Sequence, residues 1–413
     1  MQFTRQLSAL RHPQFFRYWL GSFTSVGATQ LQVMGLGWLI YELSNSSLTL
    51  GYLGAAAGIP ATVITLFGGA LADRLDKRLV LIVTSLLTAG LLGVLAVLDY
   101  LKLAEVWHVL LITAAISVVT GFDWPVRQSI FPAFIEREDM MSAVALTTFL
   151  WQATRMVMPA MGGIMIAVAD TWLLFACCSA GFFFMFLVLL TLRVNASVPA
   201  PRHSTLQQIR QGFRFILQQR LFLVLILLSY ALSFFASSYM QLMPAFADML
   251  AVDETGFGYL LSIGGIGAVL GTVIAGTLQH SIHLGRVMIL AALVFLIFLY
   301  VFAWVAWAGY TGSFAMALAA IFAAAVFYSI FMVTSTGVLQ LEVPDELRGR
   351  VMGFHAITYN LMPLGALFSG AIASWSNPSA AIAVSTSIVA LFVLWIWLKE
   401  AEVTTINGGQ LAH

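Results

Sequence analysis

The feature that most constrains this chain is a series of long apolar stretches separated by short charged segments. Twelve of them are long enough to cross the roughly 30 Å hydrocarbon core of a bilayer. Their approximate limits are residues 14–42, 48–71, 79–98, 105–128, 140–168, 170–192, 220–247, 256–279, 286–307, 312–341, 350–375 and 380–398. With 61% apolar and 9% charged residues, the chain cannot cover a water-soluble globular surface. The sequence therefore predicts an all-α integral membrane protein with twelve transmembrane helices.

The basic residues fall almost entirely on one side of this map. Of the 19 lysines and arginines, Lys102 alone lies on the opposite side and Arg155 alone lies inside an apolar stretch. Because lysine and arginine gather in the cytoplasmic loops of membrane proteins, this bias predicts that both termini are cytoplasmic. A wrong number of spans would scramble the asymmetry, so the bias supports the count of twelve independently.

The chain also repeats itself. Residues 50–72 align without gaps on residues 257–279, half a chain further on, with identities that include Gly51, Tyr52 and Gly69. Such duplication is typical of parallel-repeat transporters, in which the substrate path runs between the two halves. The sequence thus predicts two pseudo-symmetric six-helix bundles. The expected domains are residues 1–192 and 220–399 for the bundles, 193–219 for a cytoplasmic linker and 400–413 for a cytoplasmic tail.

The linker between the halves contains one amphipathic segment. Phe213 and Ile216 recur at helical intervals, with Arg210 and Arg214 interleaved. We expect a helix on the cytoplasmic surface. Its bases either meet anionic membrane lipid or belong to a solvated linker helix.

Composition and motifs argue against several other classes of protein. A net charge of +1 lacks the basic excess that a nucleic-acid partner requires. Cys177 and Cys178 are adjacent in an apolar run, which favours packing over a disulfide or a metal site. The seven histidines are scattered, and no P-loop interrupts the chain. We therefore expect a secondary transporter, acting as a monomer on a small molecule, with no enzymatic activity, cofactor or metal.

The loop between the second and third stretches carries the most specific motif. A charged cluster beside a membrane must lie in water, so GGALADRLDKRLVL (68–81) is expected to form a short aqueous turn. Its spacing resembles the pattern G-x-L-A-D-R-x-G-R/K-R/K of the major facilitator superfamily, except that Asp76 replaces the second glycine. The matching residues are Gly69, Leu71, Ala72, Asp73, Arg74, Lys77 and Arg78.

Further stretches narrow the resemblance. WLIYELSNSSLTLG, DWPVRQSIFPAFIERED, ATRMVMPAMGG and LQLEVPDELRGRVMG are similar to the branch that includes the enterobactin exporter and drug–proton antiporters, and the likeness spans residues 10–398. This resemblance implies alternating access in the bacterial inner membrane and export of a siderophore or drug, with a proton or another coupling ion. A lysophospholipid carrier and an uptake carrier of the same fold remain open as alternatives.

The resemblance also assigns a gate. It implies that Asp73 meets the N-terminal end of the eleventh span and that Lys77 reaches Asp123, with Arg127 and Arg350 joining the network. The full set expected to couple the conformational states is Gly69, Asp73, Arg74, Lys77, Arg78, Asp123, Arg127 and Arg350.

The fifth span carries a second motif. Pro159, Gly162 and Gly163 resemble part of the exporter-associated pattern G-x-x-x-G-P-x-x-G-G, in which Thr154 and Met158 replace the first two glycines. Because proline lacks a backbone donor and glycine lacks a side chain, this segment predicts a helix bend or a close helix contact.

Arg155 lies near the middle of the same span, where a cation costs about 3 kcal/mol on insertion scales. No acid is expected at its depth. Either carbonyls and amides such as Gln30 form hydrogen bonds with its guanidinium, or Arg155 faces the substrate cavity and meets an anionic group of the substrate.

For proton coupling, Asp123 is the acid nearest in depth to the cavity. Its alternative role is structural, as the partner of basic residues in the loop. The residues expected to line the cavity are Gln30, Trp151, Gln152, Arg155, Tyr328, Tyr359 and Asn360.

Overall fold

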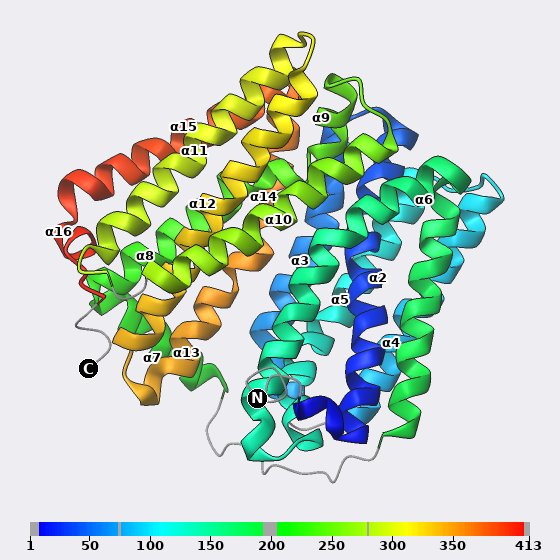
Figure 1. Ribbon diagram of the computed structural model, residues 1–413, viewed down its shortest axis with the longest axis horizontal. Coiled ribbons are helices and arrows are strands. Elements are labelled where there is room, and N and C mark those ends of the chain that lie inside the picture. Colours follow the sequence, from blue (N-terminus) through cyan, green and yellow to red (C-terminus); the bar gives the residue numbers. More distant parts are fainter. Residues whose placement is uncertain (1–7, 73–75, 193–204, 279–280, 409–413) are drawn as a thin grey trace. The chain divides into compact units, whose positions relative to one another are not determined.

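The computed structural model describes residues 8–72, 76–192, 205–278 and 281–408, and these are almost entirely helical (Figure 1). The long helices are α2 (Pro13–Ser44), α3 (Ser47–Ala72), α4 (Lys77–Tyr100), α5 (Val106–Ile130), α6 (Met140–Thr191), α7 (Thr205–Gln218), α8 (Arg220–Ala231), α10 (Glu254–Leu278), α11 (Leu284–Ala308), α12 (Ser313–Glu342), α13 (Asp345–Ala356), α14 (Thr358–Trp375) and α15 (Pro378–Lys399). Shorter helices are η1 (Ser8–Arg11), η2 (Phe131–Phe134), η3 (Arg137–Asp139), η4 (Leu232–Ala236), η5 (Ser237–Met240), α9 (Met243–Met249) and α16 (Ala401–Thr404).

Ten helical segments of the described chain are long and apolar enough to span a membrane. One of them is α6, which has 52 residues and contains a break at Asp170, where φ is 73° and ψ is 175°. At about 1.5 Å per residue, α6 is more than twice as long as a bilayer core is thick. The chain is thus a multi-pass helical membrane protein. The count of twelve spans stays a prediction, because α2 is not among these ten segments. The cytoplasmic location of the two termini stays a prediction as well.

The chain divides into two compact units. The first comprises residues 1–44, 56–201 and 254–258, and the second comprises residues 45–55, 202–253 and 259–413. In the first unit α6 packs along α2 and α4, and in the second α11 packs along α12 and α15. The domain limits expected from the sequence remain predictions.

Small residues allow close packing inside the first unit. A Cβ on Gly21 of α2 would lie 2.7 Å from Met185 Sδ, and one on Gly35 would lie 2.6 Å from Leu174 Cδ2. Both contacts are with α6, so glycine at these positions lets the two helices approach. Phe15 and Leu189 are fully buried in the same core.

Asp76, the departure from the superfamily pattern, caps a helix. It is the N-cap of α4, and its Oδ1 accepts hydrogen bonds from the backbone N–H of Arg78 at 2.9 Å and of Leu79 at 3.2 Å. An aspartate in this position satisfies otherwise unpaired donors and stabilises a helix by about 1 kcal/mol. The aspartate that replaces the second glycine of the superfamily pattern therefore has a local structural role as a helix cap.

Residues 400–408 pack on the rest of the second unit. The N–H of Gly285 donates to the carbonyl of Ile406 at 3.2 Å, and that of Gly408 donates to the carbonyl of Ser281 at 2.9 Å. Arg220 donates two hydrogen bonds to the Glu400 carboxylate, from Nε to Oε2 at 2.8 Å and from Nη2 to Oε1 at 2.6 Å. The start of the expected tail is therefore docked, at least through Gly408.

We expect Glu400→Gln to lower the thermal stability of the protein in a pH-dependent way. Bonding to Arg220 lowers the pKa of Glu400 below its ordinary value of 4.5. A carboxyl with a depressed folded-state pKa stabilises the fold above its unfolded pKa, and this contribution is lost as the pH falls through the folded value. Melting curves in detergent should therefore separate the variant from the wild type at pH 7 and bring them together as the pH falls through the depressed folded-state pKa. Glu402→Gln, at an exposed site on the same segment, should have no such effect.

Candidate functional site

A buried ion pair lies inside the first unit. Arg127 Nε donates to Asp123 Oδ2 one turn earlier on α5, and the two side chains are 11% and 16% exposed. Thr84 Oγ1 on α4 donates to Asp123 Oδ1 at 2.8 Å, and Arg127 Nη1 donates to Ser25 Oγ on α2 at 3.2 Å. The network therefore links three helices and places each charge beside hydrogen-bonding partners.

Helical spacing explains why these two charges meet. Residues four apart share one face of a helix, so Asp123 and Arg127 pair without any contribution from tertiary structure. Their low exposure strongly favours the pairing, because an isolated buried charge costs several kcal/mol. The hydroxyls of Thr84 and Ser25 then satisfy hydrogen-bonding capacity that the pair leaves open.

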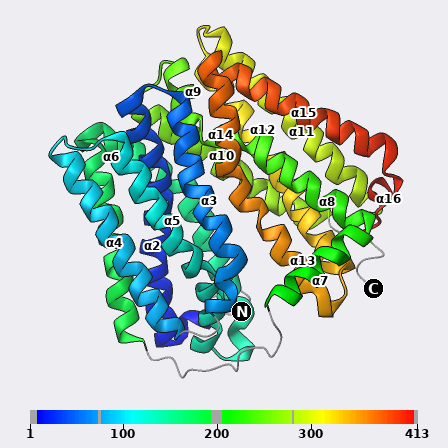
Figure 2. The same ribbon diagram turned by 180° about the vertical axis from the view of Figure 1, so that it is seen from behind.

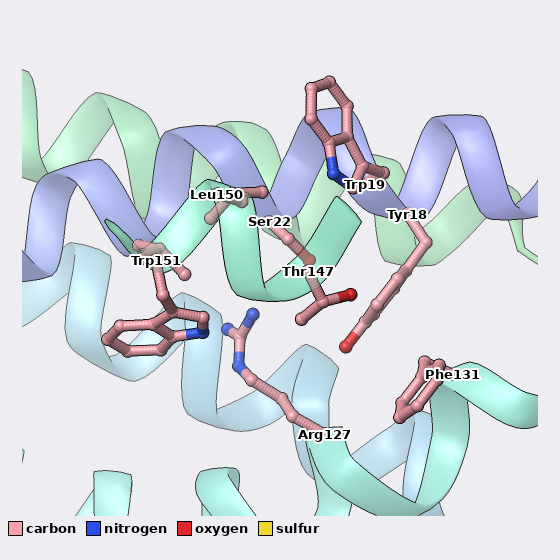
Figure 3. Close-up of a pocket in the computed structure, with 9 residues that line it drawn as sticks. Tyr18, Trp19, Ser22, Arg127, Phe131, Thr147, Leu150 and Trp151 are labelled. Carbon is pink, nitrogen blue, oxygen red and sulfur yellow. The ribbon is translucent and has the colours of Figure 1, made fainter. Parts of the chain in front are cut away.

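Arg127 also lines a small pocket of about 40 Å³. Figure 3 shows its guanidinium, the Tyr18 hydroxyl and the Trp151 indole directed toward this space. The volume suits one or two water molecules, whereas sites for drug-sized ligands occupy several hundred Å³. The pocket is thus an extension of the polar network and too small for a drug-sized substrate. The other lining residues are Trp19, Ser22, Val26, Phe131, Thr147 and Leu150.

The expected gate residues are only partly placed. Gly69, Asp73 and Arg74 lie outside the residues whose surroundings the structure describes. The described ion pairs do not include Lys77 with Asp123, because Arg127 occupies the carboxylate from its own helix. The contact of Lys77 with Asp123 that the resemblance implies stays a prediction.

Two other basic residues of the expected gate contact helix surfaces. Arg78 donates from Nε to the carbonyl of Leu189 at 3.0 Å and from Nη2 to that of Leu190 at 2.8 Å. A cation at the last carbonyls of α6 complements the negative end of its dipole. In the second unit, Arg350 of α13 packs against Gly212 of α7.

The expected cavity residues in the first unit lie on α6 and α2. Trp151 shares the small pocket with Arg127, while Gln152, Arg155 and Gln30 are half-buried. Within the described part of the chain, Arg155 makes no hydrogen bond or ion pair with a protein group, and neither does Gln30. The expected amide contact between them is therefore not formed in this structure.

The expected cavity residues in the second unit have different surroundings. The Tyr328 hydroxyl on α12 lies 3.1 Å from Ser233 Oγ, and its ring centroid lies 5.0 Å from that of Phe295. On α14, Tyr359 is 66% exposed and Asn360 is half-buried.

The fifth-span motif makes close helix contacts. The helical backbone continues through Pro159, and a Cβ on Gly163 would lie 2.5 Å from the carbonyl oxygen of Glu254. A Cβ on Gly258 of α10 would in turn lie 2.6 Å from the carbonyl oxygen of Pro159, and one on Gly162 would lie 2.8 Å from Met34 Sδ. Of the two expected outcomes, the structure displays the close contact.

Several residues of the site had no signal in the sequence. Ser25 and Thr84 are single hydroxyl residues in apolar helices, where such residues are common, and Tyr18 lies in an aromatic-rich segment. Outside this network, in the second unit, the buried His355 has Nε2 3.0 Å from Thr336 Oγ1. Only the packing of distant helices reveals these partners.

Comparison with known proteins decides the family. The family described as transmembrane secretion effector, a branch of the major facilitator superfamily, matches residues 4–410. The chain belongs to this family. The membership predicted from the loop motif is therefore confirmed, and the protein is a multi-pass membrane transporter and no enzyme.

Two curated relatives and two solved structures agree with this assignment. The enterobactin exporters EntS of Escherichia coli O1:K1 / APEC and of Shigella boydii serotype 18 are each 26% identical over 385 residues, which is 92% of this chain and 90% of theirs. The nucleoside transporter NupG is 14% identical with a TM-score of 0.72, covering 93% of this chain and 98% of its own. An inward-facing bacterial homologue of the iron transporter ferroportin is 15% identical with a TM-score of 0.75, covering 95% and 99%. At these identities the solved structures establish the fold alone.

Proposed function

We propose that this transporter exports a small amphipathic or anionic compound, a siderophore or a drug, across the bacterial inner membrane. The observation that carries the proposal is the similarity to the EntS exporters, which extends over 92% of the chain. The assignment to a family of secretion effectors supports the same direction of transport. A lysophospholipid carrier and an uptake carrier remain the competing outcomes of the test.

The proposed mechanism is alternating access between two six-helix bundles with cytoplasmic termini. The length of α6 supports twelve spans, because 52 residues with a break at Asp170 suffice for two crossings. The one-sided distribution of basic residues supports the orientation. In this scheme the protein acts as a monomer, and the superfamily loop with Asp73, Arg74 and Lys77 stabilises one of the alternating states.

Arg155 is the proposed contact for an anionic substrate. It lies on α6 one turn after Trp151, and no described protein group neutralises it. An unpaired cation within a membrane span is costly unless a ligand or water compensates it. A substrate carboxylate or phenolate would supply that compensation.

Proton antiport is the proposed coupling, and the structure favours a structural role for Asp123 within it. Both oxygens of the Asp123 carboxylate already bind protein groups, Oδ1 the Thr84 hydroxyl and Oδ2 the Arg127 guanidinium. We therefore propose that Asp123 and Arg127 stabilise the N-terminal bundle and that the proton is carried by another group.

Transport by the purified protein in inside-out proteoliposomes tests the function. With an acidic lumen, we expect accumulation of a catecholate siderophore or an amphipathic drug, and we expect a protonophore to abolish it. Empty liposomes and liposomes at equal pH serve as controls. Movement of lysophospholipid without either solute would favour the lipid carrier, and efflux from the vesicles under every gradient would favour uptake.

A further inference from the structure

One face of α7 is fixed against its own unit. Gly212 and Ile216 are buried, and a Cβ on Gly212 would lie 3.0 Å from Arg350 Cβ and 3.3 Å from the Phe354 ring on α13. The rings of Phe213 and Phe354 lie 5.9 Å apart between centroids. Figure 2 shows α7 beside α13 within this unit. The orientation of α7 about its own axis is thus set by packing.

The face of α7 that adjoins the packed one is exposed and has two chemically different halves. Phe213 and Leu217 are 51% and 53% exposed, and Arg210 and Arg214 are exposed as well. Since successive residues are about 100° apart around a helix, Phe213 and Leu217 stand together, directly beside the two arginines. Around the helix, the order is buried residues, then exposed apolar residues, then basic residues.

This order matches the chemistry of a membrane interface. Apolar side chains next to the protein-packed face can enter the boundary between headgroups and acyl chains, while arginines one step further round remain at the level of the phosphates. In water, by contrast, the two large apolar side chains would stay solvated at a cost in free energy.

The position of α7 in the chain places this face near a membrane surface. Only Gln219, with φ −112° and ψ 106°, separates α7 from α8, and the span Arg220–Met240 begins at the next residue. A single residue cannot carry the exposed face far from the point where α8 enters the bilayer.

The charges of this region are suited to an anionic partner. Residues 193–219 contain no aspartate or glutamate. Arg210 and Arg214 make no ion pair within the described chain, whereas the nearby Arg220 is neutralised by Glu400. Two uncompensated guanidiniums therefore remain on the exposed face.

We propose that the face formed by Arg210, Phe213, Arg214 and Leu217 binds the phosphate headgroups of anionic lipids in the leaflet where α8 begins. The arginines bind the headgroups, and Phe213 and Leu217 anchor the helix at the acyl boundary. The linker helix thereby couples the second unit to the lipid composition of that leaflet.

A fluorophore at Leu217→Cys, in a protein whose native cysteines are replaced (Cys177→Ser and Cys178→Ser), reports on this contact. Phosphatidylglycerol is titrated into nanodiscs of phosphatidylcholine that contain the full-length protein. We expect a blue shift and loss of quenching by aqueous iodide as the anionic lipid increases. Each base contributes about fivefold to affinity for an anionic surface, so Arg210→Gln with Arg214→Gln should weaken the binding at least tenfold and move the midpoint to a clearly higher fraction of phosphatidylglycerol.

The matched control removes two exposed arginines elsewhere, Arg11→Gln and Arg286→Gln, and should leave the midpoint unchanged. An equal shift in this control would attribute the effect to net charge and overturn the proposal. If iodide quenches the label equally in phosphatidylcholine and in phosphatidylglycerol, the linker helix is solvated, and this result would also overturn the proposal. Protection of the label in lipid-free detergent together with a doubled mass would assign the face to a second copy of the chain, which also overturns it.

Discussion

Replacing Arg127 by methionine is expected to destabilise the protein by about 3–5 kcal/mol, the usual cost of breaking a buried ion pair on one side. The change leaves the Asp123 carboxylate buried with the Thr84 hydroxyl as its one described partner. Equilibrium unfolding in mixed detergent micelles, followed by circular dichroism, measures the difference. The exposed pair of Lys102 and Asp170, whose side chains are 67% and 40% exposed, is the matched comparison. Lys102→Met should cost less than about 1 kcal/mol.

A double variant separates charge burial from loss of packing. If the unpaired carboxylate causes the instability, Asp123→Leu in the Arg127→Met background should recover a large part of it, because a buried pair can be replaced by apolar residues at little cost. A double variant that is less stable than Arg127→Met alone would contradict this account. Similar losses for Lys102→Met and Arg127→Met would contradict it as well.

Replacing Arg155 by alanine is expected to reduce export of an anionic substrate at least tenfold while the amount of folded protein stays the same. The reason is that a hydrogen bond to a charged group contributes about 1.5–3 kcal/mol, which corresponds to roughly 10- to 100-fold in affinity. Initial rates in inside-out proteoliposomes, measured over a range of substrate concentrations, provide the test. Arg155→Lys should retain part of the activity, because it keeps the charge but loses the planar fork.

Two controls distinguish substrate contact from a structural role for Arg155. An uncharged substrate should be transported equally well by the wild type and Arg155→Ala. Arg11→Ala, which removes an exposed arginine, should transport both substrates normally. If Arg155→Ala instead lost both activities in parallel or failed to fold, Arg155 would serve the packing of α6.

Much of the architecture follows from local properties of the sequence. Hydrophobic length decides which segments can cross a bilayer, and this length is visible residue by residue, as in the strongly apolar 284–308 region that forms α11. The superfamily loop is equally local, because a few residues at fixed spacing define its pattern. Local chemistry also accounts for Asp76, since an N-cap bonds only to the first turn of its own helix.

The partners of the buried charges depended on tertiary packing. Arg127 reaches the Asp123 carboxylate from one turn along the same helix. The contact of Lys77 with Asp123 that the resemblance implies stays a prediction. The hydroxyls that complete the network come from α4 and α2, far away in the sequence. The same holds for Arg220 and Glu400, which are 180 residues apart. Apolar periodicity determines that a helix is buried but not which polar group lies opposite a given position, because that depends on how separate helices pack against one another.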